Sequence, residues 1–185
     1  MANIIKASVV QCSTVKYDVD ATLEKMDRLV KLARERDGSQ LAVFPEAFLG
    51  GYPKGLTFGC VVGERDPTGR DDYLAYVQSA VTIPGPAITR VEVIAKRHDV
   101  MIVSGAIEKV GGTLYCSVIW VHPEHGLVGK RRKDHVQASK DAHLESKSDE
   151  DEEGIKIAGG SVIIDPMGKV LAGPLRGSEG CLKQQ

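Results

Sequence analysis

One glutamate, Glu46, stands at the end of an apolar run and is the first candidate for chemistry. The run 41–44 (LAVF) has the composition of a short buried strand. Pro45 ends it, because proline removes a backbone donor and is not expected inside a central strand. A carboxylate at such a strand end is partly removed from water, so its pKa tends upward and it becomes a candidate general base. A solvated loop glutamate is the alternative.

Basic residues and thiols are the other groups that could react. Four consecutive basic residues, 130–133, by themselves favour a solvated strand edge. Cys60 follows the Gly- and Pro-rich turn at 50–53 and could approach Glu46, whereas Cys116 lies in an apolar run and is expected to be a buried thiol with a raised pKa. The four cysteines lack metal-ligand spacing and the five histidines form no HxxxH pair, so we predict no metal site.

Composition sets the protein class. A chain of 185 residues with 42% hydrophobic and 26% charged residues can form one globular domain. The net charge of −1 gives no electrostatic reason to expect nucleic acid or a membrane surface as partner. The apolar runs are too short to span a bilayer, and the N-terminus reads as a strand and not as a signal peptide. We therefore expect a cytoplasmic protein with free thiols.

Alternating strands and helices must position these groups. Residues 4–12 and 41–44 are predicted strands, with an amphipathic helix between them at 20–36. Asp18 or Asp20 can cap the start of this helix, and Gly38 lies just past its end. A loop over 54–72, a short helix at 72–80 and a helix at 86–98 follow. Three strands come next, at 100–108, 113–121 and 127–130, the first two joined by a Gly-Gly hairpin turn. This order predicts a layered α/β fold.

The segment 38–53, GSQLAVFPEAFLGGYP, resembles the first signature of the nitrilase family of carbon–nitrogen hydrolases. That signature has a glycine, an apolar strand, a glutamate shortly after an Ile or Phe, and a closing Gly-Tyr-Pro. The glycine, the glutamate and the closing triplet all match in register, at Gly38, Glu46 and 51–53. Ala42 is smaller than the large apolar residue that the family usually has at this position. The resemblance implies an α-β-β-α sandwich, a Glu-Lys-Cys triad, no cofactor and a homo-oligomeric assembly.

The resemblance also gives expected roles to individual residues. Glu46 would be the general base, and Lys133, which ends the Gly-Lys-Arg-Arg-Lys run, would stabilise negative charge on the substrate. Tyr52 is a candidate substrate-binding residue. The nucleophilic cysteine should lie well after Lys133, but the sequence there does not match the family, so no nucleophile is found and Cys60 and Cys116 stay weak candidates.

The match is interrupted over 134–154, an acidic junction with five acids in a row from Asp149 to Glu153, which we predict to be a loop. It returns over 157–180, within the C-terminal part 155–185. There GGSVIIDPMGKVLAGP resembles a late family hairpin with strands at 155–164 and 169–172 and a turn at 166–168. The sequence stops soon after Gly180, where a family member would continue to a further strand and a C-terminal tail. We therefore expect a single truncated domain over 1–185, with the Glu and Lys of the triad in 1–133 and an incomplete, marginally stable sandwich.

Three functions compete. The first is a nitrilase by descent that converts a nitrile and water to a carboxylic acid and ammonia, inactive here because its nucleophile is missing. The second is a non-catalytic partner that assembles with a full-length nitrilase. The third is a related cyanide hydratase or amidase. The substrate expected in each catalytic case is a small molecule.

Overall fold

The computed structural model describes residues 5–53, 58, 67–133, 160–165 and 167–183. Eleven elements follow along these ranges: β1 (Ala7–Gln11), α1 (Val19–Asp37), β2 (Leu41–Val43), α2 (Pro67–Ser79), α3 (Pro86–His98), β3 (Met101–Val110), β4 (Thr113–His122), β5 (Gly126–Arg132), β6 (Ser161–Ile164), β7 (Val170–Leu175) and β8 (Gly180–Lys183). No helix within the described ranges is long and apolar enough to cross a bilayer.

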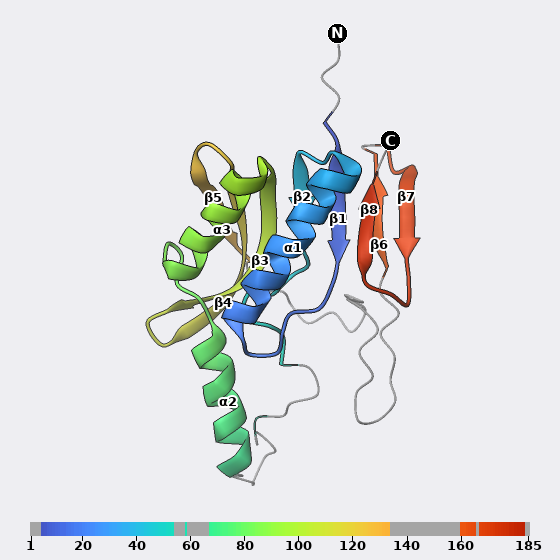
Figure 1. Ribbon diagram of the computed structural model, residues 1–185. Coiled ribbons are helices and arrows are strands. Elements are labelled where there is room, and N and C mark those ends of the chain that lie inside the picture. Colours follow the sequence, from blue (N-terminus) through green and yellow to red (C-terminus); the bar gives the residue numbers. More distant parts are fainter. Residues whose placement is uncertain (1–4, 54–57, 59–66, 134–159, 166, 184–185) are drawn as a thin grey trace.

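A six-stranded sheet in the order β5-β4-β3-β2-β1-β8 forms the centre of the fold (Figure 1). The strands β1, β2 and β3 are parallel and are connected through helices, and β3, β4 and β5 form an antiparallel meander. A separate two-stranded sheet pairs β6 with β7. The predicted α/β fold is confirmed, including the hairpin between β3 and β4.

Helices α1 and α3 lie side by side across one face of the large sheet (Figure 1). Every second residue of the strands points at these helices, and this alternation builds the core. Ala42, Ile102 and Ile119 are each 0% exposed on the helix side, against Met26 and Val91 of the helices. The intervening residues, which include the valines described below, point away from the helices.

The helix α1 begins and ends where the sequence indicates. The carboxylate of Asp18 accepts a hydrogen bond from the Ala21 N–H over 2.9 Å, so it caps the first turn. At the other end Gly38 adopts a left-handed φ of 65° and its N–H bonds to Arg34 O. The chain then enters β2 directly, which fixes the start of the strand that leads to Glu46.

One predicted boundary is wrong, and one strand was not predicted. The loop expected over 54–72 gives way at Pro67 to the helix α2, since proline suits a first helical turn. The start predicted at 155 for the next strand lies outside the described residues, and within them β6 begins at Ser161. The strand that was not predicted begins at Gly180: β8 pairs antiparallel with β1 at the sheet edge, where Val9 lies opposite Leu182.

One buried glutamine adds to the β8–β1 pairing in holding the C-terminal segment to the sheet. The side-chain oxygen of Gln11, a residue 2% exposed, accepts hydrogen bonds from the backbone N–H groups of Gly160 and Ser161. Its side-chain nitrogen donates to Ser178 O over 2.6 Å. Because a buried amide that loses its partners is costly, Gln11 couples β1 to both sides of the late hairpin. Of the hairpin turn predicted at 166–168, the structure describes Met167 and Gly168, and the Gly168 N–H donates to Asp165 O over 3.0 Å.

Candidate functional site

Glu46 lies where the chain leaves β2 and crosses over β3. After Phe44 the backbone continues along β3, with the Gly105 N–H donating to Pro45 O over 3.1 Å and Leu49 N–H donating to Gly105 O over 3.1 Å. Ala47 takes a left-handed φ of 54° to make this crossing. The strand end thus turns the Glu46 side chain away from the helices.

Gly105 makes this close crossing possible. A Cβ at that position would lie 2.5 Å from the Ala47 N, 2.5 Å from the Glu46 Cα and 2.6 Å from the Pro45 O. All three neighbours are backbone atoms, which cannot move without shifting the whole segment. Residue 105 must therefore be glycine for the Glu46 backbone to pass this close to β3.

Lys133 approaches Glu46 from β5. The Lys133 N–H donates to Cys116 O over 2.7 Å, so the pairing of β5 with β4 continues one residue beyond the strand. Its Nζ then donates to Oε1 of Glu46 over 2.6 Å. The two side chains are 41% and 37% exposed, so the pair lies at the mouth of the site and not in the core. The structure brings together the two residues that the sequence assigned to one site.

Cys116 completes the cluster. Its Sγ lies 3.1 Å from the same Oε1 of Glu46, in donor geometry. The side chain is half-buried and points into a cavity, not into the core as the sequence suggested. The other weak candidate, Cys60, lies outside the described residues. Tyr52 is 74% exposed and does not line the cavity, although it lies near enough to contribute to the raised pKa of Lys133.

The three groups shift one another's protonation. Burial would raise the pKa of Glu46, but hydrogen bonds from Lys133 and Cys116 and the charge of Lys133 outweigh it, so the pKa lies below its ordinary 4.5. The upward shift expected from the sequence is therefore wrong, because a strand-end carboxylate here has a cation within contact. The hydrogen bond to Glu46 raises the pKa of Lys133. Burial, then the Glu46 carboxylate, raises the pKa of Cys116 to about 11.

The cavity around this cluster measures about 570 Å³, within the range of small-molecule sites. Val43, Val103 and Val118 form its apolar wall, on the sheet face away from the helices. Its polar end holds Glu46, Cys116 and Lys133, and its full lining adds Phe44, Gly105, Ser117, Arg131 and Arg132. An apolar wall with one charged end suits a small molecule that carries a polar group on a hydrophobic body.

A buried ion cluster centred on Glu108 joins β3 to β5 next to the cavity and supports this end of β5. Glu108 on β3 is 0% exposed and accepts hydrogen bonds from Lys130 (2.5 Å), from Arg132 (2.8 and 3.0 Å) and from the Ser117 hydroxyl (2.9 Å). These contacts, Arg132 first, hold the pKa of Glu108 at about 2. The sequence analysis missed this cluster. The pattern that could have predicted the cluster is a glutamate within one apolar strand, together with basic residues at alternate positions of a later strand.

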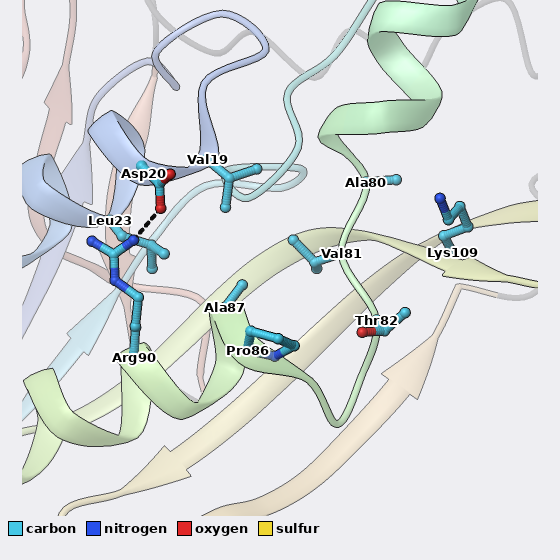
Figure 2. A pocket seen from close by; sticks show the side chains of 10 residues that line it. All are labelled: Val19, Asp20, Leu23, Ala80, Val81, Thr82, Pro86, Ala87, Arg90 and Lys109. Carbon is cyan, nitrogen blue, oxygen red and sulfur yellow. Dashed lines mark hydrogen bonds and ion pairs between the residues drawn. The ribbon is translucent and has the colours of Figure 1, made fainter.

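A smaller cavity of about 310 Å³ lies between α1, α3 and the segment before α3 (Figure 2). Asp20 and Arg90 form an ion pair across it, and most of its other lining residues are apolar. Neither charged group is paired with a nucleophile, so this cavity offers no chemistry comparable to the Glu46 site.

Among the described residues, three side chains at the turn between β4 and β5 form a group that could hold a metal ion. The ligand atoms of His122, Glu124 and His125 lie within 4.8 Å of one another. The sequence analysis predicted no metal site, and the turn was not recognised as bringing these side chains together. Nδ1 of His122 accepts a hydrogen bond from the Glu124 N–H over 3.1 Å, which occupies one of the ligand atoms. We assign no metal to this turn.

The chain is similar to known carbon-nitrogen hydrolases. The family model described as carbon-nitrogen hydrolase matches residues 6–151. An arylacetonitrilase of Trametes versicolor (strain FP-101664) is 59% identical over 133 residues, which cover 72% of this chain and 42% of that protein. Nitrilase 2 of Arabidopsis thaliana is 45% identical over 132 residues, 71% of this chain and 39% of that protein. The chain thus spans about two-fifths of the length of these relatives.

Solved structures show the same fold. An amidase from Nesterenkonia sp. superposes with a TM-score of 0.65 at 14% identity, over 97% of this chain and 89% of that one. A protein of the same superfamily from Xanthomonas campestris superposes with a TM-score of 0.52 at 18% identity, over 72% of this chain and 42% of that one. The family-model match, the nitrilase relatives and this fold together establish that the chain belongs to the carbon-nitrogen hydrolase family.

Proposed function

We propose that this chain carries the base and the lysine of a nitrilase site, binds nitriles there, and does not turn them over as written. The observation that supports this most directly is the bond from Lys133 Nζ to Glu46 Oε1, 2.6 Å long, at the polar end of the cavity. Glu46 is the proposed general base and Lys133 the proposed cation for negative charge that develops on nitrogen.

The protonation states suit these roles. A Glu46 with a pKa below its ordinary value is ionised near pH 7 and can accept a proton. A Lys133 with a raised pKa stays an ammonium and can stabilise an anion. A nitrile has a linear polar group on an organic body, so its nitrogen would face Lys133 while its body lies against the valine wall.

Turnover is the part that we propose to be lost. The resemblance places the family's nucleophile after Lys133, in a stretch that this sequence does not contain. The described thiol nearest to the base, Cys116, has a pKa of about 11, so about one part in ten thousand is ionised at pH 7. Covalent catalysis depends on a thiolate, and triad members act together, so repeated hydrolysis should fall to background.

Ammonia release and ligand binding test the two halves of this proposal separately. The purified 185-residue chain is incubated with aromatic and aliphatic nitriles and with the matching carboxamides, and ammonia is measured with Glu46→Gln as control. We expect no release above background. Release that disappears in Glu46→Gln would show that the chain is an active hydrolase, and release from the carboxamides alone would point to an amidase.

Binding is followed by NMR chemical-shift changes on titration with phenylacetonitrile. We expect shifts that cluster at the cavity and weaken in Lys133→Met. The matched control is Lys31→Met, which removes a helix-surface lysine whose side chain is 58% exposed. A folded sample that shows no cavity shifts would overturn the proposed nitrile site.

A further inference from the structure

Cys116 differs from the other described cysteines in what it contacts. Its Sγ is 3.1 Å from Oε1 of Glu46, and that oxygen is itself 2.6 Å from Lys133 Nζ. Cys181 on β8 is half-buried and packs against the core, and Cys12 is 3% exposed within the core. Cys116 combines a proton acceptor, a neighbouring ammonium and a cavity of about 570 Å³ for a second reactant.

We propose that Cys116 is the reactive thiol of this chain and that it adds to the carbon of an electron-poor nitrile held in the cavity. This inference rests on the proposed function, because it uses the same cavity and the same Glu46. It departs from the resemblance, in which the nucleophile follows Lys133 in the chain; Cys116 lies before it, on β4. The product is a stoichiometric thioimidate adduct on this side chain.

The step balances without any further reactant. The proton of the Cys116 thiol moves to Oε1 of Glu46, and the sulfur electron pair forms a bond to the nitrile carbon. One π pair of the C≡N bond moves to nitrogen, which Lys133 stabilises and which then receives the proton from Glu46. The net change is the addition of S–H across C≡N, so the mass of the chain rises by the whole mass of the nitrile.

Glu46 has two opposing effects on this thiol, and the difference between them makes the proposal testable. As an anion it helps to raise the pKa of Cys116, so it suppresses any reaction that needs free thiolate. As a hydrogen-bond acceptor it can take the proton during attack, which favours addition to a bound nitrile. Other groups facing the thiol are Lys133, which lowers its pKa, and Tyr76, whose own pKa the thiol helps to raise.

The experiment compares two electrophiles on the full chain. 2-Cyanopyrimidine probes nitrile addition and iodoacetamide probes simple thiolate alkylation, both followed by intact mass and by peptide mapping. We expect one nitrile adduct per chain, located on Cys116 and absent in Cys116→Ser. In Glu46→Gln we expect nitrile addition to slow by at least about a hundredfold, the usual size of general-base assistance, while iodoacetamide labelling of Cys116 becomes faster.

The matched control is Cys181→Ser, in which Cys116 should be labelled as it is in the chain without substitutions. An adduct on any other cysteine, or a Glu46→Gln variant in which both reactions become faster, would overturn the proposal. Peptide mapping of the chain without substitutions locates the nitrile adduct even if a variant does not fold. Cavity shifts with phenylacetonitrile but no adduct would reject the thiol assignment alone, whereas loss of both would reject the nitrile site as well.

Discussion

Replacing Glu108 by glutamine should remove a large part of the folding stability of this chain. The substitution keeps the shape of a side chain that is 0% exposed but deletes its charge. Lys130 and Arg132 then lose their shared anion, and an amide must accept hydrogen bonds where a carboxylate did. Breaking a buried ion pair from one side typically costs about 3–5 kcal/mol.

The structure places the expected value at the lower end of that range. A Glu108 pKa of about 2, against an ordinary 4.5, corresponds to about 3 kcal/mol at about 1.4 kcal/mol per factor of ten. The side chains of Lys130 and Arg132 are 33% and 39% exposed, so both cations can regain water when the anion is gone. We therefore expect a loss of about 3 kcal/mol at pH 7.

The sign of the pH dependence provides a second check. A folded-state pKa that is lowered contributes stability that is fully present above the unfolded value of about 4.5 and is lost as pH falls toward about 2. The difference between the unmodified chain and Glu108→Gln should therefore shrink on acidification, to about 2 kcal/mol at pH 3.5. The variant should lack this part of the acid sensitivity.

Urea unfolding followed by circular dichroism at pH 7, 5 and 3.5 measures the effect. Glu35→Gln is the matched control: Glu35 is 66% exposed and 3.9 Å from Lys31, a surface pair expected to contribute less than about 0.5 kcal/mol. An unchanged urea slope would show that the variant changed stability and not the unfolding transition itself. A loss at pH 7 no larger than that of the control would refute the argument that Glu108 anchors β5.

Three further predictions follow from the same geometry. Gly105→Ala should cost at least about 2 kcal/mol in urea unfolding and abolish the nitrile-induced shifts, because its Cβ would overlap the Glu46 backbone; Gly112→Ala, whose Cβ meets nothing within 4 Å, is the control and should retain both. Lys133→Met should raise the pKa of Glu46, measured by NMR titration of its carboxyl carbon, and an unchanged value would contradict the assigned cause. Asp18→Ala should cost about 1 kcal/mol in the same unfolding assay through loss of its cap, and equal stability would argue against that cap.

Much of the fold could be predicted from local pattern. Helical spacing, with Asp18 or Asp20 before it and Gly38 after it, predicted α1, and Pro86 predicted the start of α3, because caps and prolines act on adjacent residues. The two strands around the Gly-Gly turn could likewise be predicted from the sequence. The strand β8 could not be predicted, since its four residues gain strand geometry only by pairing with β1.

Part of the cluster at the cavity could be predicted from the sequence. Glu46 and Lys133 could be named from the sequence because each follows a recognisable strand within a family-like segment. The position of Cys116 could not, because an apolar strand has two faces and nothing local says which one faces a cavity. For the same reason the shift in the pKa of Glu46 had the wrong sign: burial can be guessed from neighbours in sequence, but a cation 87 positions away cannot.

The sequence by itself therefore determined the order of elements, the family and two of the three groups in the cluster. Local propensities, caps and turn residues act over a few positions and are written directly in the chain. Only the tertiary structure decided that Gly105 must lack a side chain, that Glu108 holds the end of β5, and that the Cys116 thiol and the Lys133 ammonium contact the same Glu46 oxygen. Those facts depend on atoms brought together across the sheet, where distance and dielectric set the chemistry.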